Sequence, residues 1–258
     1  MRMRFLATLA TVITVHASAM SMQASEQLYT PGQYKPSFSA CAQLFPDNTP
    51  IDTSAISKKL KPIPLCSDNF ANLYSGETKT PLIVIEKLNR AGLADASDEE
   101  RTNDFFADPR LPKELRSELS DYKSSGYDRG HNSPAADQQT ANAMAQSFSL
   151  SNMMPQDQTN NRKIWSKIES DTRKFARRAK GNVFVFTGPL FKDQVKTIGS
   201  NQVWVPTLLF KLVYDEANNR AWGYVIPNQS DVRVGPPMSY ADFVKVSGWD
   251  VLKGKGIN

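Results

Sequence analysis

Residues suited to acid–base, metal and phosphate chemistry gather between positions 128 and 173. His131 ends the run Asp128-Arg129-Gly130-His131, and Asn161, Glu169 and Arg173 follow on a stretch with helical spacing. A neutral histidine, with a pKa of about 6.5, accepts a proton from water at physiological pH. Magnesium accepts amide and carboxylate oxygens as ligands, and a guanidinium offers phosphate a fixed fork of donors. Together these residue types suit the hydrolysis of a phosphodiester bond.

His131 is the one histidine that we expect in the mature chain. The sequence has two histidines, and His16 falls in a stretch typical of a cleaved leader. A lone histidine is more often a surface or core residue than a catalytic one, so its type alone predicts little. Its spacing from Asn161 and Glu169 is what favours the role of general base.

The N-terminus has the residue order of a secretory signal peptide. Two arginines precede the eleven uncharged residues 5–15, and the small residues 17–19 follow. We expect cleavage after Ala19 or Ala24 and a secreted or periplasmic mature protein. Eleven residues are too few to span a bilayer, so we expect no membrane association of the mature form. Mitochondrial import is the alternative, because acidic residues are absent before position 26, but the apolar core lacks an amphipathic pattern.

Cysteine usage fits an exported chain. The only cysteines, Cys41 and Cys66, lie in an irregular region rich in Pro, Ser and Thr. An oxidising compartment would join them, so we expect a disulfide. Two cysteines and one histidine in no tight cluster do not suit a structural zinc site. The expected organisation is a leader at 1–24, an extended disulfide-stapled arm at 25–66 and one folded domain at 67–258.

Length and composition are those of an ordinary globular protein with a single large core. The chain has 258 residues, of which 40% are hydrophobic and 22% are charged. Its formal net charge is +5 at pH 7, and loss of the two leader arginines lowers this charge to +3. A mild positive balance suits a polyanionic partner, but many basic proteins bind none, so charge alone decides little.

Hydrophobic periodicity predicts an α+β domain with a largely antiparallel sheet and packed helices. The apolar run 81–86 predicts a buried strand, and the alternation over 148–153 predicts a half-buried strand. One long helix is expected from about 160 to 180, ended by Gly181. The last two of the remaining strands should form a hairpin through 215–219. These strands are expected at 183–186, 203–205, 207–214 and 221–226.

The predicted helix presents its polar residues on one broad face. At about 100° per residue, Glu169 lies about 80° round from Asn161, and Arg173 about 120° round. An adjoining arc is apolar and suits packing into the core. Its residues are Ile164, Ile168 and Phe175. The helix can therefore pack one side inward while the other presents an amide, a carboxylate and a guanidinium to a site.

Several motifs in the middle of the chain agree in both type and spacing. They are Asp128-Arg129-Gly130-His131, Leu150-Ser151-Asn152-Met153 with Pro155-Gln156, Asn161-Arg162, Trp165, Glu169 and Arg173. This set resembles the sugar-nonspecific DNA/RNA endonucleases of the ββα-metal, or His-Me finger, type, which include secreted bacterial nucleases and mitochondrial endonuclease G. The resemblance covers roughly residues 67–228, and its central block is specific because motif and spacing agree over a long span.

The resemblance implies a ββα-metal finger active site within a nuclease domain at 67–258. His131 matches the general base of the family, and Asn161 matches the single direct protein ligand of magnesium. Glu169 looks like the carboxylate that binds metal-coordinated water. The implied cofactor is Mg²⁺, with Mn²⁺ as the alternative. The implied products carry 5′-phosphate and 3′-hydroxyl ends.

Three arginines and a second amide complete the implied site. Arg129 and Arg173 look like phosphate or transition-state contacts. Asn152 matches a polar residue that supports the histidine region. Arg101 is the candidate for a further phosphate-contacting arginine, although no motif fixes its register.

Several of these residues also have a plainer interpretation. Asn161 could cap the helix, since Asn is favoured at helix starts. Glu169 and Arg173, four residues apart, could form an ordinary helix-stabilising pair. Asp128 is expected to hold the loop and Arg129 in place rather than to bind metal. The basic residues of the helix beyond Arg173 suit a nucleic-acid track and a solvated face equally well.

The sequence therefore predicts an exported, magnesium-dependent endonuclease that hydrolyses DNA and RNA. Little sequence preference is expected, because such a site contacts the phosphodiester backbone rather than base edges. One alternative is a non-catalytic protein that holds nucleic acid for uptake or adhesion, but a binder needs no combination of His131, Asn161 and Glu169. Another is a phosphodiesterase for small or lipid-linked substrates, which a narrow pocket would favour.

Overall fold

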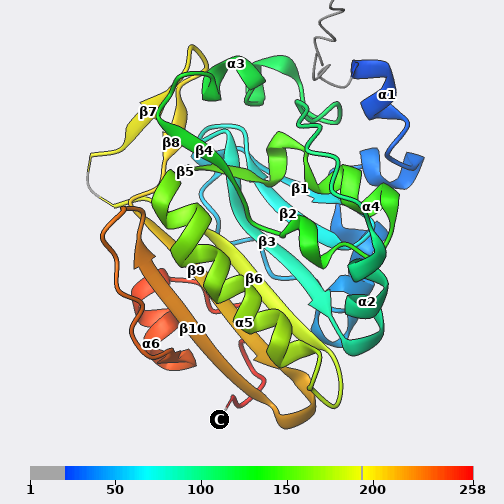
Figure 1. The fold of residues 1–258 in the computed structure, drawn as a ribbon, viewed down its shortest axis with the longest axis vertical. Helices are drawn as coiled ribbons and strands as arrows, with labels where there is room; N and C mark the ends of the chain where they lie inside the picture. The colour runs from blue at the N-terminus through cyan, green and yellow to red at the C-terminus, as the bar shows by residue number, and fades with distance from the viewer. Residues whose placement is uncertain (1–20, 193, 258) are drawn as a thin grey trace, which may run out of the picture.

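A seven-stranded antiparallel sheet forms the centre of the part of the chain that the structure describes (Figure 1). The structure is a computed structural model, and it describes residues 21–192 and 194–257. The strand order is β1-β2-β3-β6-β9-β10-β11. These strands are β1 (Pro62–Cys66), β2 (Phe70–Ser75), β3 (Thr80–Leu88), β6 (Val183–Leu190), β9 (Leu208–Asp215), β10 (Arg220–Pro227) and β11 (Met238–Ser239). The predicted α+β class with a largely antiparallel sheet is confirmed.

Two short strand pairs and several helices surround this sheet. β4 (Tyr127–His131) pairs with β5 (Met153–Asp157), and β7 (Lys196–Ile198) pairs with β8 (Val203–Val205). The helices are α1 (Met22–Glu26), α2 (Arg90–Asp95), α3 (Leu119–Tyr122), α4 (Ala141–Ser147), α5 (Ser166–Ala176) and α6 (Tyr240–Ser247). Among the helices described, none is both long and apolar enough to cross a membrane.

The central strands bury side chains on both faces of the sheet. In β6, Val183 and Val185 pack beside α5, whereas Phe184 and Phe186 belong to the larger core on the opposite face. This alternation follows the two-residue period of a strand. Figure 1 shows α5 lying across one face, over β6, β9 and β10. Because both faces are covered, β6 is buried along its whole length, and the sheet is a rigid base for α5.

Most strand predictions agree with the structure, and the hairpin joining β9 to β10 is confirmed. A short 3-10 turn, Glu216–Asn218, makes the connection. The predicted strands correspond to β3, β6, β8, β9 and β10, with ends that differ by at most four residues. Several elements were not predicted, among them β2, β7, α2, α4 and α6.

The strand predicted at 148–153 is wrong in position. A 3-10 turn occupies Leu150–Asn152, and β5 begins only at Met153. The polar residues of this stretch do not face solvent, because Ser149 and Ser151 are buried and both donate to Asp108 Oδ2, at 2.9 and 2.5 Å. Their alternation with apolar residues therefore did not mark a solvated strand face.

The segment expected to be an extended arm packs into the core instead. It folds into short 3-10 turns, among them Phe38–Leu44. Phe38, Leu44 and Phe45 are buried in the same hydrophobic cluster as the inner face of the sheet. Cys41 and Cys66 form the predicted disulfide, which ties this segment to β1. Apolar residues spaced irregularly can thus join a core that periodicity does not reveal.

Loss of this disulfide is expected to lower the free energy of unfolding by about 3 kcal/mol. The double substitution Cys41→Ala with Cys66→Ala frees a loop whose ends are 25 residues apart in sequence, which raises the conformational entropy of the unfolded chain. Urea unfolding of the variant and of wild type measures the difference. Reduced wild-type protein should unfold like the variant. Equal stability of all three samples would contradict the expectation.

Candidate active site

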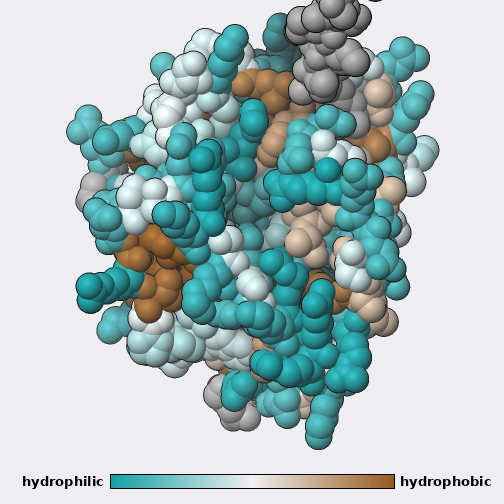
Figure 2. Space-filling view, in the orientation of Figure 1, coloured by the Kyte–Doolittle hydropathy of each residue, from teal (hydrophilic) through white to brown (hydrophobic). Residues whose placement is uncertain are grey.

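The β4–β5 pair carries His131 and its neighbours at close range. Gly130 lies opposite Met154 in the antiparallel register. A Cβ at Gly130 would collide with the side chain of Gln156, so only glycine lets the two strands approach here. The need for this close approach explains the glycine between Arg129 and His131. Figure 2 shows a recess near the middle of the face seen in Figure 1, bordered largely by hydrophilic residues.

His131 is buried against two aromatic rings. Its ring meets Phe148 edge-on at 5.1 Å between centroids and lies 5.7 Å from Phe105. Burial lowers the pKa of His131 to about 3, and the positive charges of Arg101 and Arg129 lower it further. The sequence suggested an ordinary pKa of about 6.5. The structure instead holds the imidazole neutral across the physiological pH range, in the form that accepts a proton.

An NMR titration should therefore find no protonation of His131 between pH 5 and pH 8. Because the pKa of His131 is lower in the folded than in the unfolded state, the unfolded chain binds this proton at a higher pH as the pH falls, which favours unfolding. This group's contribution to stability is then present above pH 6.5 and lost as the pH falls toward 3. Imidazole ¹⁵N shifts, assigned by comparison with His131→Gln, measure the titration. A midpoint near pH 6.5 would show that the ring is hydrated rather than buried.

Asn152 braces the backbone that follows His131. Its Nδ2 donates to the carbonyls of Ser133 and Ser147, each at 2.9 Å, and its Oδ1 accepts from the Ser133 amide at 3.0 Å. The backbone oxygen of Asn152 also accepts from the amide of Asn132 at 3.0 Å. These bonds fix the backbone directly after His131, which is the geometry that the supporting role predicted for Asn152 requires.

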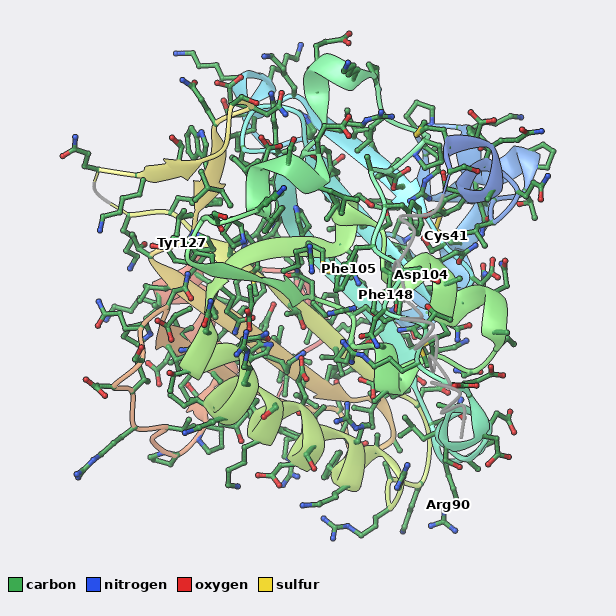
Figure 3. All side chains as sticks on the ribbon, turned by 45° about the horizontal axis from the view of Figure 1, so that its top comes forward. Cys41, Arg90, Asp104, Phe105, Tyr127 and Phe148 are labelled. Atoms are coloured by element: carbon green, nitrogen blue, oxygen red, sulfur yellow. A yellow bond between two sulfur atoms is a disulfide. The ribbon has the colours of Figure 1, made fainter. Side chains whose placement is uncertain are left out.

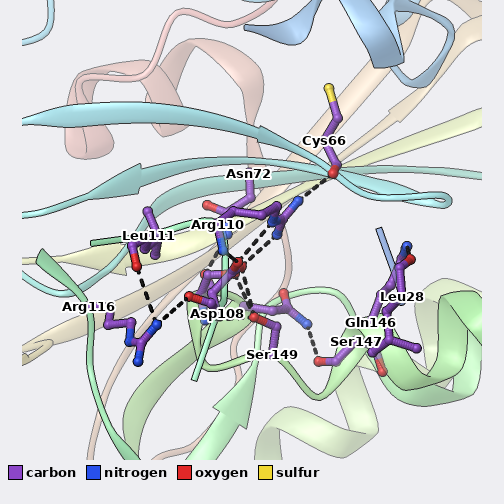
Figure 4. A network of polar contacts seen from close by, with 12 residues as sticks. Leu28, Cys66, Asn72, Asp108, Arg110, Leu111, Arg116, Gln146, Ser147 and Ser149 are labelled. Carbon is purple, nitrogen blue, oxygen red and sulfur yellow. Dashed lines mark hydrogen bonds and ion pairs between the residues drawn. The ribbon is translucent and has the colours of Figure 1, made fainter. Parts of the chain in front are cut away.

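A buried ion pair anchors the turn that precedes Asn152 (Figure 4). The side chains of Asp108 and Arg110 are both fully buried, with Arg110 Nη2 2.6 Å from Asp108 Oδ2. Arg110 Nη1 also donates to the carbonyl of Cys66, which joins this network to β1 beside the disulfide. The Ser149 and Ser151 hydroxyls bind the same carboxylate. The network therefore fixes the segment that carries Asn152.

Asn161 lies in a π-helical turn, Asn160–Trp165, directly before α5. Its backbone carbonyl accepts from the Ser166 amide, a wider hydrogen bond than that of an α-helix. Such π-turns are frequent at functional sites. The long predicted helix at 160–180 is thus a π-turn followed by an α-helix that ends at Ala176. Asn161 does not cap the helix: its side chain makes no capping bond and reaches a strand instead.

Asp128 sets the orientation of the Asn161 amide. Asn161 Nδ2 donates to Asp128 Oδ2 at 2.9 Å. Arg162 donates to the same carboxylate through Nε and Nη2, at 2.8 and 2.7 Å. Because the nitrogen is engaged, the Asn161 Oδ1 atom is left as the oxygen available to a ligand. That donor fits a divalent cation, which prefers oxygen ligands.

Replacing Asp128 with alanine should weaken the affinity of this site for Mg²⁺ by about 10- to 100-fold. The amide of Asn161 would lose the partner that fixes which of its two atoms faces the site. Isothermal titration calorimetry with Mg²⁺ measures the affinity. Arg162→Ala is the matched control, since it removes the other partner of Asp128 but keeps the bond to Asn161. Equal affinity of Asp128→Ala and the control would refute the orienting role.

Glu169 is half-buried near a group of buried charged side chains. Burial raises the pKa of Glu169 to about 7, and the positive charge of Lys211 opposes that rise. Lys211 is buried in β9 and donates to Thr187 Oγ1 at 2.7 Å. Burial likewise raises the pKa of Glu86, on β3, to about 8. Carboxyl groups with such shifted pKa values are typical of functional sites.

Arg173 contacts the buried Asp137 rather than Glu169. Its Nη1 donates to Asp137 Oδ1 at 2.9 Å. Within the described residues Glu169 and Arg173 form no ion pair, so the simple helix pair is not formed. Asp137 was missed in the sequence because nothing in its surroundings distinguished it from an ordinary surface acid.

Arg129 and Arg101 both lie against aromatic rings at the site. The guanidinium carbon of Arg129 is 4.1 Å from the ring centroid of Phe105, and that of Arg101 is 5.2 Å from Phe148. Phe148 also packs against His131, so Arg101 and His131 contact the same ring, and the positive charge of Arg101 lowers the pKa of His131 and that of Glu169. The structure thus brings Arg101, whose register no sequence motif fixed, to the same site as His131.

The architecture is that of a ββα-metal finger, with two antiparallel strands followed by the π-turn and α5. Comparison with known proteins agrees with it. Residues 49–254 match the family described as DNA/RNA non-specific endonuclease. This match covers most of the chain, and the chain therefore belongs to the DNA/RNA non-specific endonuclease family.

Relatives and a solved structure show the same likeness. The chain is 38% identical to "Mitochondrial nuclease" of Saccharomyces cerevisiae over 165 residues, 58% of this chain and 50% of the relative. It is 35% identical to "Endonuclease G, mitochondrial" of Homo sapiens over 175 residues, 62% of this chain and 58% of the relative. A chain in the crystal structure of an EndoG/EndoGI complex aligns with a TM-score of 0.63 and 29% identity, covering 72% of this chain and 83% of that chain. This chain spans about half the length of the curated relatives that it matches.

Proposed function

We propose that the protein is a metal-dependent endonuclease that hydrolyses DNA and RNA with little sequence preference. The observation that carries this proposal is the combination of a His131 imidazole buried against Phe105 and Phe148 with an Asn161 amide whose oxygen is left free by Asp128. A protein that only holds nucleic acid needs neither feature. Membership of the DNA/RNA non-specific endonuclease family supports the same substrates.

In the proposed reaction, water attacks the phosphorus of a phosphodiester and His131 takes its proton, while the P–O3′ bond breaks and the 3′-oxygen leaves and takes up a proton as the 3′-hydroxyl. The neutral imidazole is ready for this step without first losing a proton, although its low pKa makes it a weaker base. Arg129 and Arg173 hold the phosphate, and their positive charge stabilises the negative charge that grows on it. With the phosphodiester backbone as the recognised group, base identity has little effect on the rate.

We assign the cation site to Asn161, with Glu169 contacting the cation through water, and we propose Mg²⁺ with Mn²⁺ as the alternative. When bound, the cation supplies positive charge for the phosphorane and the leaving oxygen. An amide ligand carries no charge and so leaves that positive charge available to the phosphate. Glu169 is suited to a water-mediated contact, because it accepts no hydrogen bond from other side chains in the described part of the chain.

We also propose that the protein is exported, on the basis of the leader pattern at 1–24, of which residues 1–20 lie outside the described residues. The disulfide supports an oxidising destination. The relatives named above are mitochondrial by name, so import into an organelle is the rival outcome. N-terminal sequencing of the mature protein from each cell fraction decides between them, since export predicts a start at Met20 or Ser25.

Cleavage assays with three polymers test the proposed function. Single-stranded DNA, double-stranded DNA and RNA of equal length are incubated with the protein in Mg²⁺, in Mn²⁺ and in EDTA. We expect all three to be degraded with either cation and none in EDTA. Binding without cleavage would instead show a nucleic-acid-holding protein. Hydrolysis of bis-(p-nitrophenyl) phosphate with intact polymers would show a small-molecule phosphodiesterase.

A further inference from the structure

We propose that Phe105 is a positioning residue that holds Arg129 and His131 in their working orientations. This inference rests on the proposed function and adds a residue to it. Arg129 and His131 are two apart on β4, so their side chains project from the same face of the strand. Phe105 comes from a distant loop and lies against both of them.

The contacts to Phe105 matter because polar contacts do not orient these two side chains. Among the described residues, neither side chain has a hydrogen-bond or ion-pair partner, and Arg129 Nε and His131 Nε2 are both buried without one. The Arg129 guanidinium lies 4.1 Å from the centre of the Phe105 ring, within the range of a cation–π interaction. The imidazole of His131 packs 5.7 Å from the same ring at an interplanar angle of 58°.

Phe105 is itself held firmly in place. Its ring meets Phe148 edge-on at 5.0 Å, and Phe148 also packs against His131. Its neighbour Phe106 exchanges backbone hydrogen bonds with the segment before β5: the Phe106 amide donates to Phe148 at 3.3 Å, and the Leu150 amide donates to Phe106 at 2.8 Å. Figure 3 shows Phe105 and Phe148 near one another beside the β4–β5 pair. Packing on Phe148 and the backbone bonds of Phe106 therefore hold the Phe105 ring in one position.

An aromatic ring suits this task better than a carboxylate would. A carboxylate would also hold Arg129, but it would occupy the N–H groups and cancel part of the positive charge that phosphate needs. The face of a ring attracts the guanidinium and leaves its in-plane donors free. The same ring fills the space beside His131, so one residue orders a phosphate contact and a proton acceptor.

Three substitutions separate these effects. Phe105→Ala removes the ring and should lower kcat by about 10²-fold, because a misplacement of about 1 Å in a catalytic group has an effect of that size. Phe105→Tyr keeps the ring and should stay within about twofold of wild type. Phe105→Leu keeps an apolar side chain of similar size but has no π face, so its kcat should lie between those of Phe105→Ala and Phe105→Tyr. Values of kcat and KM are measured with double-stranded DNA in Mg²⁺, with kcat referred to the folded fraction.

Two further comparisons exclude a merely structural role. Phe191→Ala removes a ring that packs on Trp204, outside the candidate site, and should leave kcat and KM unchanged. In an Arg129→Ala background, Phe105→Ala should lower kcat by a clearly smaller factor than in wild type, because one of the two side chains that Phe105 positions is already absent. Full additivity of the two substitutions, or a wild-type kcat for Phe105→Ala, would overturn the proposal.

One readout does not depend on cleavage and so separates this inference from the proposed function. Removing the Phe105 ring should shift the imidazole NMR signals of His131, through lost ring current, whether or not the protein is a nuclease. Phe191→Ala should leave those signals in place. Unchanged His131 signals in Phe105→Ala would overturn the positioning role even if the wild-type protein were inactive. If the wild-type protein is inactive but the His131 signals still shift in Phe105→Ala, only the proposed nuclease function is refuted.

Discussion

Replacing His131 with alanine is expected to lower the single-turnover rate of DNA cleavage by about 10²- to 10⁴-fold. The water that attacks phosphorus would lose the group that takes its proton. No other histidine lies in the described residues, and the nearby carboxyl of Glu169 is assigned to the cation. The rate is measured with protein in excess over a labelled duplex, in Mg²⁺.

DNA binding provides the control for this substitution. His131→Ala and His131→Gln should both bind the duplex in EDTA as wild type does, because phosphate contacts come from arginines. His131→Gln keeps a polar side chain of similar size but offers no basic nitrogen, so its loss of rate should match that of alanine. A variant that cleaves within tenfold of wild type would show that another group takes the proton.

The second large effect is expected at Asn161. Asn161→Ala should raise the Mg²⁺ concentration required for half-maximal cleavage by about 10²-fold or more, since the only proposed direct protein ligand is lost. Activity at saturating Mg²⁺ should remain well below wild type, because the cation would no longer be fixed beside the phosphate. Cleavage rates across a Mg²⁺ titration measure both quantities.

Asn218→Ala is a matched control for Asn161→Ala. Asn218 is also an amide that donates through Nδ2 to an aspartate, Asp215, at 2.7 Å, but it lies in the β9–β10 turn. Its substitution should leave the Mg²⁺ dependence unchanged. If Asn161→Ala and Asn218→Ala require the same Mg²⁺ concentration for half-maximal cleavage, residues other than Asn161 hold the cation.

Much of the fold was predictable because its central strands carry strong local patterns. The runs that became β3, β9 and β10 are rich in β-branched and aromatic residues and bounded by turn residues, so their limits were close to the observed ones. Local pattern failed at 148–153, where serine hydroxyls are buried against Asp108. It also failed for the arm, whose Phe38 and Phe45 reach the core from irregular backbone.

The candidate site was predictable in its residue types but not in their surroundings. The spacing of His131, Asn161 and Glu169 pointed to one site, and the structure adds the partners that tune it. Phe105 and Asp137 come from separate segments, and their contacts depend on tertiary packing that no local pattern encodes. For the same reason the sequence suggested an ordinary pKa for His131, whereas burial sets it far lower.

If this chain hydrolyses internal phosphodiester bonds, it must nick a closed circular plasmid, and the ends at each nick show which P–O bond was broken. The protein is incubated briefly with supercoiled plasmid in Mg²⁺, stopped with EDTA, purified and treated with DNA ligase. We predict nicked circles that ligase reseals, because breakage of the P–O3′ bond as water attacks phosphorus leaves a 5′-phosphate beside a 3′-hydroxyl. Plasmid that stays supercoiled in Mg²⁺, or nicks that ligase reseals only after end repair, would contradict this prediction.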